Sequence, residues 1–199
     1  MRLEVLDRGH RLRARVALRL IRLLGRTEPD PVAKTVLYRP AVFGRPWGRL
    51  IRSIMRGPSE WSHGERELIA AHVSRLNECR FCHGVHTGTA SMLLGPAVVE
   101  RLDRWREGEF DERLAATFAL LERVTRTPDE LRPGDVARVR AAGVSASGVA
   151  DALYICFVFN TVNRLAGAFG YDWATEVDRV RLAAGLNRMG YRIPGFLLR

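Results

Sequence analysis

Lysine is almost absent from this sequence, because Lys34 is the only lysine among 32 basic residues. A bias that uniform indicates a GC-rich genome more than selection at each position, so the arginine content alone does not indicate nucleic-acid binding. The sequence also lacks zinc-finger spacing, an aromatic RNA-binding signature and a basic low-complexity tail. We therefore expect no nucleic-acid partner, despite a formal net charge of +10.

Long apolar runs are missing as well. The best candidates, 152–159 and the arginine-interrupted 16–24, fall short of the roughly 18 to 20 residues that span a bilayer. The N-terminus has no uninterrupted apolar region and no small-residue cleavage site, which argues against a secretory signal. We expect a cytoplasmic protein. In that reducing compartment, three cysteines do not form a disulfide framework, and a close CxxC pair is redox-active or metal-binding.

The positive charge is concentrated at the N-terminus. Residues 1–26 hold eight arginines against two acidic residues, a net charge of +6, which leaves +4 for the other 173 residues. The arginines recur at steps of three and four, and an apolar stripe accompanies them: Leu12, Val16, Leu20 and Leu23. This pattern predicts a basic amphipathic helix over 1–27. The helix could pack on the body or on a neighbouring subunit, or attach to an anionic membrane surface.

The rest of the chain divides into a connector and a helical domain. Prolines at 29, 31, 40 and 46 indicate a Pro-rich, extended connector over 28–54, with little helix. A capping box, with Ser62 as N-cap and Glu65 three residues later, begins the helical pattern of the domain over 55–199. We expect a second helix from Asn77 to about residue 94, and later helices at 97–106, 111–126, 133–142, 146–169 and 173–188. With no hairpin signal, the prediction is an all-α single domain with an N-terminal amphipathic helix.

The motif that indicates chemistry is Cys79-Arg80-Phe81-Cys82. The two cysteines are three residues apart, so on a helix their sulfurs face the same side and can form a small disulfide ring. His86 follows Cys82 by four residues, so one turn presents two thiols and an imidazole. A position just after a helix start also favours thiolate over thiol. These features predict a redox-active dithiol.

The segment 67–86 resembles the alkylhydroperoxidase D-like branch of the carboxymuconolactone decarboxylase superfamily, especially its peroxidase-related members. Glu67 stands twelve residues before Cys79, as in that family, and the later segment 159–166, Phe-Asn-Thr-Val-Asn-Arg-Leu-Ala, also looks like the second half of such domains. The likeness covers roughly residues 55–170. It implies an all-helical bundle that forms homo-oligomers.

The resemblance also implies catalytic roles. Cys82 would attack a hydroperoxide and become a sulfenic acid, and Cys79 would protonate the leaving oxygen and then resolve Cys82 to a disulfide. His86 and Glu67 would relay the proton from Cys82 through a water molecule. One departure is Phe81, because better-known members have a histidine before the second cysteine; His83 could partly replace it.

Each candidate also has a structural interpretation. Glu67 could be a surface carboxylate, although its small neighbours on the same face suggest close packing. His86 could be a core histidine, and we expect Cys156 to be a buried core thiol. His63 and His72 are expected to be structural or at the surface. Asn163 and Arg164 could cap or pair within the core or line the mouth of the site, and a structural role is favoured.

The leading functional hypothesis is a peroxidase or disulfide reductase that cycles the Cys79–Cys82 pair. It would need no cofactor and would use an external dithiol reductant, such as a thioredoxin-like or lipoyl protein. Lactone decarboxylation, the superfamily's other activity, requires no cysteine pair. A zinc site made by the two cysteines, His86 and a further histidine is a second hypothesis, although no separated ligand pair is evident. A third is a redox switch without turnover that binds a membrane surface through residues 1–26.

Overall fold

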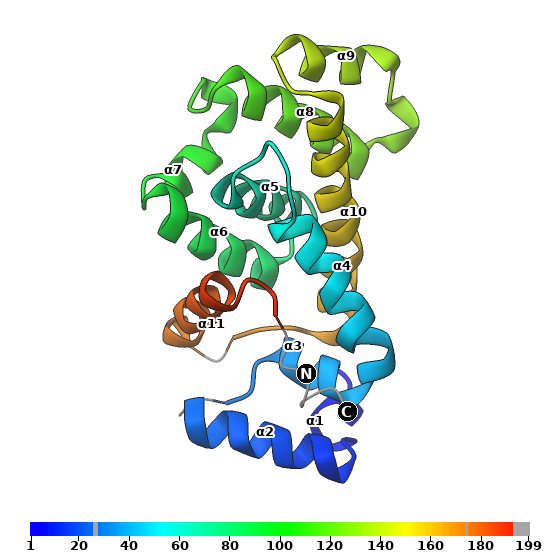
Figure 1. Ribbon diagram of the computed structural model, residues 1–199, viewed down its shortest axis with the longest axis vertical. Helices are drawn as coiled ribbons and strands as arrows, with labels where there is room; N and C mark the ends of the chain where they lie inside the picture. The colour runs from blue at the N-terminus through cyan, green and yellow to red at the C-terminus, as the bar shows by residue number, and fades with distance from the viewer. Residues whose placement is uncertain (26–27, 174, 193–199) are drawn as a thin grey trace.

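The computed structural model describes residues 1–25, 28–173 and 175–192, and every regular element in those ranges is a helix (Figure 1). The all-α prediction is confirmed. In chain order the elements are α1 (Val5–Arg8), α2 (Leu12–Gly25), α3 (Pro31–Tyr38), the π-helix η1 (Pro40–Gly44), α4 (Arg45–Arg56), α5 (His63–Leu76), α6 (Arg80–Leu94), α7 (Val98–Asp103), the 3-10 helix η2 (Trp105–Glu107), α8 (Glu112–Arg126), the 3-10 helix η3 (Pro128–Glu130), α9 (Pro133–Ala141), α10 (Ala146–Phe169) and α11 (Glu176–Met189).

The N-terminal quarter differs from the sequence prediction in two ways. The helix expected over 1–27 is broken between α1 and α2, and residues 26 and 27 lie outside the described part. The extended connector over 28–54 is wrong, because α3, η1 and most of α4 occupy it. Three of its four prolines, Pro31, Pro40 and Pro46, stand in the first turns of these helices. Proline is tolerated there because the first helical N–H groups have no intrahelical partner and the fixed φ suits a helix start.

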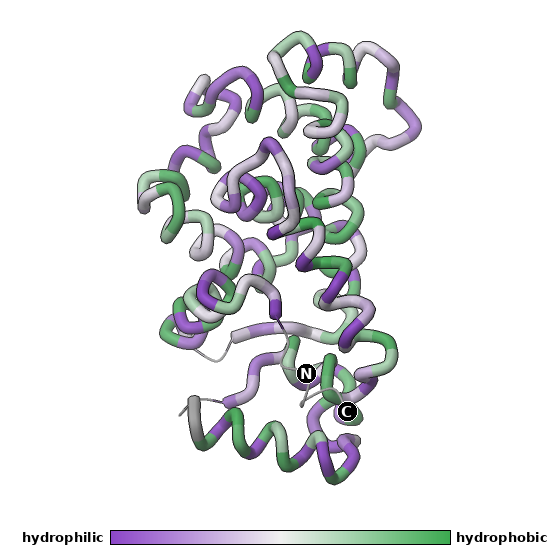
Figure 2. The backbone as a smooth tube through the Cα atoms, viewed as in Figure 1, coloured by the Kyte–Doolittle hydropathy of each residue, from purple (hydrophilic) through white to green (hydrophobic). Residues whose placement is uncertain are grey.

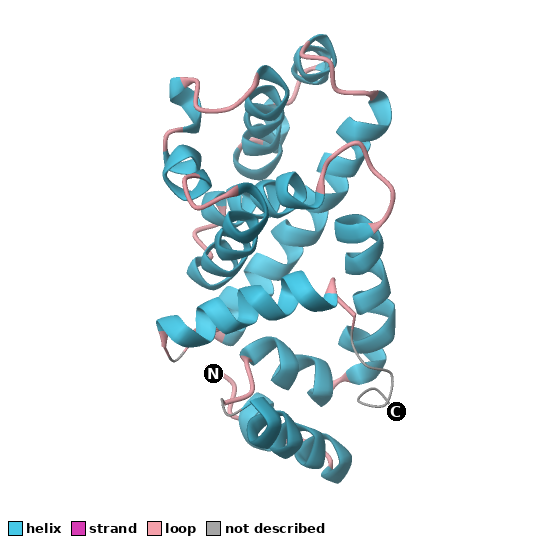
Figure 3. Cartoon of the chain, turned by 60° about the vertical axis from the view of Figure 1, so that its left-hand side comes forward, coloured by secondary structure: helices cyan, strands magenta, loops and turns pink. Residues whose placement is uncertain are grey.

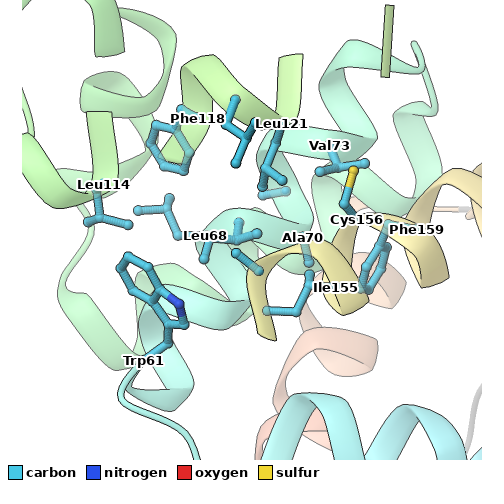
Figure 4. Close-up of a cluster of buried hydrophobic side chains, with 14 of the residues drawn as sticks. Trp61, Leu68, Ala70, Val73, Leu114, Phe118, Leu121, Ile155, Cys156 and Phe159 are labelled. Carbon is cyan, nitrogen blue, oxygen red and sulfur yellow. The ribbon is translucent and has the colours of Figure 1, made fainter. Parts of the chain in front are cut away.

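The main core surrounds α5, which packs against α6, α8 and α10. The capping box predicted at Ser62 and Glu65 is present at the start of α5. The side chains that fill the core come from helices far apart in the sequence (Figure 4), and among the largest that are almost fully buried are Trp61, Leu68, Phe118, Leu121 and Ile155. Burying side chains of this size contributes about 1.5 to 3 kcal/mol each.

The longest helix, α10, is apolar enough by length and composition to cross a bilayer, with a mean hydropathy of 1.3 over its best window. The core helix of a folded domain passes the same test. In this protein α10 packs against α4, α5, α8 and α9. Its inward side chains include Ile155, Cys156 and Phe159, all at most 2% exposed. We therefore describe α10 as a helix that contributes one side to the core and leaves Tyr154 and Phe157 exposed on the other, and Cys156 as the core thiol that the sequence predicts.

The first three helices form a separate layer at one end of the bundle (Figure 3), and hydrogen bonds fasten it to the end of α10. The Arg2 N–H donates to the Phe169 carbonyl oxygen over 2.8 Å, and the Tyr171 hydroxyl donates to Thr35 Oγ1 over 2.6 Å. Helix α11 packs on α6 and lies between this layer and the bundle (Figure 1). The N-terminal segment is therefore part of the folded unit that surrounds α6 and α11.

His72 is buried in the aromatic part of the core. Its ring stacks on Phe118 at a centroid distance of 4.4 Å and meets Trp105 edge-on at 5.3 Å. Nε2 donates to the Phe118 carbonyl oxygen over 3.2 Å, and Nδ1 has no partner among the described residues. Burial lowers the pKa of His72 from 6.5 to about 3. The His72 imidazole is therefore neutral in the folded protein near neutral pH.

This burial predicts a loss of stability in mild acid. Unfolding lets His72 bind a proton at any pH below 6.5, whereas the folded protein binds it only near pH 3. The free energy of unfolding should therefore fall by about 2 to 3 kcal/mol between pH 6.5 and 4.5. Denaturant titrations across that range measure the slope, and His72→Gln, which retains a donor for the Phe118 carbonyl, should flatten most of it. The matched control is His83→Gln, because the His83 ring is only half-buried; an equal flattening in the control would contradict the assignment.

Candidate active site

The turn between α5 and α6 brings the two cysteines to the start of α6. Glu78 takes a left-handed backbone conformation with a φ of 56°, and the Cys79 N–H donates to the Ser74 carbonyl oxygen over 2.9 Å. Cys79 is the N-cap residue of α6, and Cys82 lies in its first turn. The prediction that Asn77 begins this helix is wrong. Asn77 caps the end of α5, where its side-chain amide donates to a carbonyl of the last turn over 3.0 Å.

The two thiols are buried and free, and they are hydrogen-bonded to each other. Hydrogen bonding with the Cys82 thiol lowers the pKa of Cys79 to about 7, although burial acts in the opposite direction. The same hydrogen bond, together with burial, raises the pKa of Cys82 well above its ordinary value. Backbone N–H groups at the start of α6 also favour a negative charge there. Near neutral pH the pair therefore loses one proton as a unit, and the two sulfurs share the other.

Asn163 of α10 joins this pair. Its hydrogen bonding lowers the pKa of both cysteines. Its amide nitrogen also donates to Ser74 Oγ over 3.1 Å, and its oxygen accepts from Asn77 over 3.2 Å, which fixes the amide orientation. The sequence favoured a structural role for Asn163, and the structure adds a direct effect on the dithiol. Arg164 is exposed and bonds to the carbonyl one turn earlier.

Glu67 and His86 meet between α5 and α6. Glu67 is 0% exposed, which rejects the surface-carboxylate interpretation. His86 Nδ1 donates to Glu67 Oε2 over 2.7 Å. Burial raises the pKa of Glu67, but the hydrogen bond from His86 and the charge of Arg56 outweigh it and hold the pKa below its usual value. Because Nδ1 carries the proton toward Glu67, Nε2 is the ring nitrogen left to accept a proton.

Two further side chains complete the carboxylate's surroundings. The Arg56 guanidinium donates to Glu67 Oε1 over 2.6 Å, and the Tyr191 hydroxyl donates to the two carboxylate oxygens over 2.9 and 3.1 Å. Burial and the negative charge of Glu67 raise the pKa of Tyr191 well above its ordinary value, so the phenol keeps its proton and remains a donor. Arg56 also lies over the Tyr191 ring, 4.9 Å from its centroid. Glu67 is therefore a fully ionised, fully satisfied carboxylate that orients His86.

A cavity of about 430 Å³ opens beside these groups, between the N-terminal layer and the bundle. Cys82 and His86 line it, and Tyr191 lines it beside His86. Most of the other lining side chains are aliphatic or aromatic and come from α2, α3, α4, α6, α10 and α11, including Ile21, Val36, Trp47, Phe159, Leu182 and Leu186. Cys79 is not part of this lining. The volume is within the range of about 300 to 1,000 Å³ that small-molecule sites occupy.

Phe81 packs in one cluster with the two cysteines and lines the cavity, whereas His83 bonds elsewhere. Phe81 meets Tyr171 edge-on at 5.3 Å and stacks on Trp173 at 5.7 Å, so it anchors the start of α6 to the segment before α11. His83 Nδ1 donates to the Ala71 carbonyl oxygen over 3.1 Å, and His83 does not line the cavity. The structure therefore gives no support to the idea that His83 replaces the missing histidine.

Sequence reasoning placed Glu67, Cys79, Cys82 and His86 in one site, and the structure brings all four to α5 and the start of α6. Sequence reasoning missed Arg56 and Tyr191. Arg56 is hidden among the many arginines, and Tyr191 follows α11, 124 residues after Glu67. A positive φ of 63° at Tyr191 has no sequence signal either, because glycine is the residue that usually marks it.

The zinc hypothesis gains no support from the geometry. Across the described part of the chain, no three side chains from histidine, cysteine, aspartate or glutamate converge in a way that could hold a metal ion. His72 is enclosed in the core and His63 is exposed at the start of α5. Within the described residues, the two cysteines and His86 therefore do not form a set of metal ligands.

Comparisons with known proteins agree with this arrangement at the level of the fold. No protein-family model and no curated protein matches the chain. A solved structure of an uncharacterized peroxidase-related protein from Silicibacter sp. TM1040 is similar, with 23% identity and a TM-score of 0.68 over 79% of this chain and 83% of that one. An alkylhydroperoxidase AhpD core structure, an uncharacterized peroxidase-related protein from Ralstonia eutropha JMP134, has 20% identity and a TM-score of 0.71 over 88% of this chain and 91% of that one. The chain therefore has the all-helical alkylhydroperoxidase D-like fold that its CxxC segment indicated.

Proposed function

We propose that the protein is a thiol-dependent peroxidase that reduces an apolar organic hydroperoxide with the Cys79–Cys82 dithiol. The observation that carries the proposal is that Cys82 and His86 line the same apolar cavity. Buried Glu67 binds His86 at Nδ1, which leaves Nε2 of the ring free to accept a proton. A nucleophile, a base and a substrate cavity thus coincide at one place. The aliphatic and aromatic lining favours an organic hydroperoxide over hydrogen peroxide.

The reaction begins with proton removal. His86 Nε2 takes one proton from the dithiol, directly or through a water molecule, and Glu67 stabilises the imidazolium through the 2.7 Å hydrogen bond to Nδ1. The remaining proton is shared by the two sulfurs, and when it resides on Cys79, Cys82 is the thiolate. That form places the nucleophile at the cavity and the proton donor behind it.

Oxygen transfer and disulfide formation follow. The Cys82 thiolate attacks the terminal oxygen of the hydroperoxide, the O–O bond breaks, and the departing alkoxide takes the Cys79 proton and leaves as an alcohol. The Cys79 thiolate then attacks the Cys82 sulfenic acid, an S–S bond forms, and hydroxide leaves with the proton held by His86 as water. The hydroperoxide gains two electrons and the dithiol loses two. An external dithiol, such as a thioredoxin-like or lipoyl protein, restores the reduced enzyme by exchange.

A stoichiometric oxidation tests this proposal. One equivalent of cumene hydroperoxide should convert the reduced protein to a form two mass units lighter, with a Cys79–Cys82 disulfide and a free Cys156. Intact mass and peptide mapping measure both features. A bridge that contains Cys156, or no loss of thiols over the time in which the same peroxide oxidises a small dithiol, would refute the assignment.

A further inference from the structure

The inner face of α2 consists of small and aliphatic side chains. Ala14 and Ala17 are each 9% exposed and form a small cluster with Leu37 of α3, against which Leu18 and Ile21 also pack. Ile21 reaches further and lines the cavity that contains Cys82. This face packs α2 against α3 and the wall of the cavity.

The outer face of α2 carries the apolar stripe that the sequence analysis identified. Leu12 and Leu23 are 68% and 72% exposed, and Val16 and Leu20 are 47% and 46% exposed. At 100° per residue these four side chains fall within one arc of about 80°. The helix does pack on the body of the protein, but through its alanine face, and the leucine stripe is left exposed. Single exposed apolar residues are common on protein surfaces, but a continuous row of exposed leucine and valine side chains indicates an interaction surface.

Arginines border this stripe on both sides. Arg11, Arg15, Arg19 and Arg22 follow one edge of the arc, and Arg13 lies at the other edge. All five are exposed. Of these, only Arg22 has an ion-pair partner among the described residues, the exposed Glu28 at 2.9 Å. Figure 2 shows the alternation of hydrophobic and hydrophilic residues along α2 at the free end of the molecule.

We propose that the outer face of α2 docks on an anionic lipid bilayer, with the leucine stripe in the headgroup boundary and the arginines against lipid phosphates. An apolar stripe edged by cations is the arrangement that an interfacial helix requires. A second copy of the chain is a poorer occupant, because paired stripes would bring two rows of unpartnered arginines together. Nucleic acid is poorer too, because phosphate contacts leave the leucines exposed to water.

Helix α2 lies beside the cavity that contains Cys82, so membrane docking would bear on which substrate reaches this cavity. The same helix that faces the bilayer contributes Ile21 to the wall of the apolar cavity. Docking would therefore bring the cavity that contains Cys82 to within about one helix diameter of the bilayer surface, and we expect a hydroperoxide on an acyl chain to be the substrate class. This consequence rests on the proposed peroxidase function, whereas the docking itself does not.

Vesicle sedimentation with the full-length protein tests the docking. Vesicles of phosphatidylcholine and phosphatidylglycerol should retain the protein far better than phosphatidylcholine alone, and binding should weaken as salt increases. The double variants Leu12→Ser/Leu23→Ser and Arg15→Gln/Arg19→Gln should each weaken binding roughly tenfold or more. The matched control is Tyr154→Ser/Phe157→Ser, which removes two side chains of α10 that are each 57% exposed, and it should bind normally.

Three results would overturn the docking proposal. The first is equal retention of wild type by both vesicle compositions. The second is loss of binding in the arginine variant but not in the leucine variant, which indicates simple attraction to a polyanion. The third is a change of oligomeric mass in the leucine variant with unchanged vesicle binding, which assigns the stripe to a second copy. Cys82→Ser should bind vesicles as wild type does, so failure of peroxide reduction and failure of docking are separable.

Discussion

Hydroperoxide consumption is expected to fall at least about a thousandfold in Cys82→Ser, because a serine hydroxyl is not ionised near neutral pH and cannot replace the thiolate at the cavity. Cys82 is 3% exposed and lies in the first turn of α6, so serine should fit with little disturbance. The measurement is the rate of cumene hydroperoxide loss with excess dithiol reductant. Cys156→Ala is the matched control and should keep the wild-type rate, since Cys156 lies in the core on α10.

The partner variant separates the two thiols. Cys79→Ser should consume one equivalent of hydroperoxide and stop, leaving Cys82 as a sulfenic acid that a dimedone-type reagent labels. This test matters because the pKa of Cys79, at about 7, is the lower of the two, although Cys82 is the thiol that lines the cavity. If Cys82→Ser instead gives the labelled sulfenic acid and Cys79→Ser is inert, access to the cavity does not decide the nucleophile and the two roles are exchanged.

The parts of the site that sequence reasoning identified depend on local rules. A capping box fixes the start of α5 and hence the direction in which Glu67 points, and spacings of three and four residues place Cys79, Cys82 and His86 along one face at the start of α6. The resemblance then supplied the expectation that Glu67 and His86 act together, 19 residues apart. The antiparallel packing of α5 and α6 makes that contact.

The features that sequence reasoning missed depend on the position of a residue within a helix or on contacts between residues far apart in the sequence. A proline in the first turn of a helix and a proline in an extended linker look alike until the helix start is known, so 28–54 was read as a connector. The exposed stripe of α2 could not be assigned a direction, because a helix whose leucine row faces outward and whose alanine row faces inward reverses the usual rule. The contacts of Tyr191 with Glu67 cross most of the chain, and no local pattern encodes them.

The buried carboxylate constrains how the proton relay can be tested. Removing the charge of Glu67 leaves Arg56, whose side chain is 8% exposed, without its counter-charge, and breaking a buried pair costs about 3 to 5 kcal/mol. Glu67→Gln must therefore be compared with wild type at a temperature where thermal unfolding shows both folded. His86→Ala avoids this difficulty because it leaves the Arg56–Glu67 pair intact.

Glu67→Gln and His86→Ala should each slow peroxide consumption about tenfold to a thousandfold near neutral pH, the usual size of a lost general base. Raising the pH should restore part of the rate, because hydroxide then generates the thiolate and the defect shrinks as the pH approaches the ordinary thiol pKa of about 8.5. The double variant should be little slower than the slower single variant, since both residues serve one relay. His83→Ala, on the same helix but bonded to the Ala71 carbonyl, should keep the wild-type rate. Single variants that stay folded and match wild type at every pH would make Glu67 and His86 structural, and the dithiol would then act without assistance.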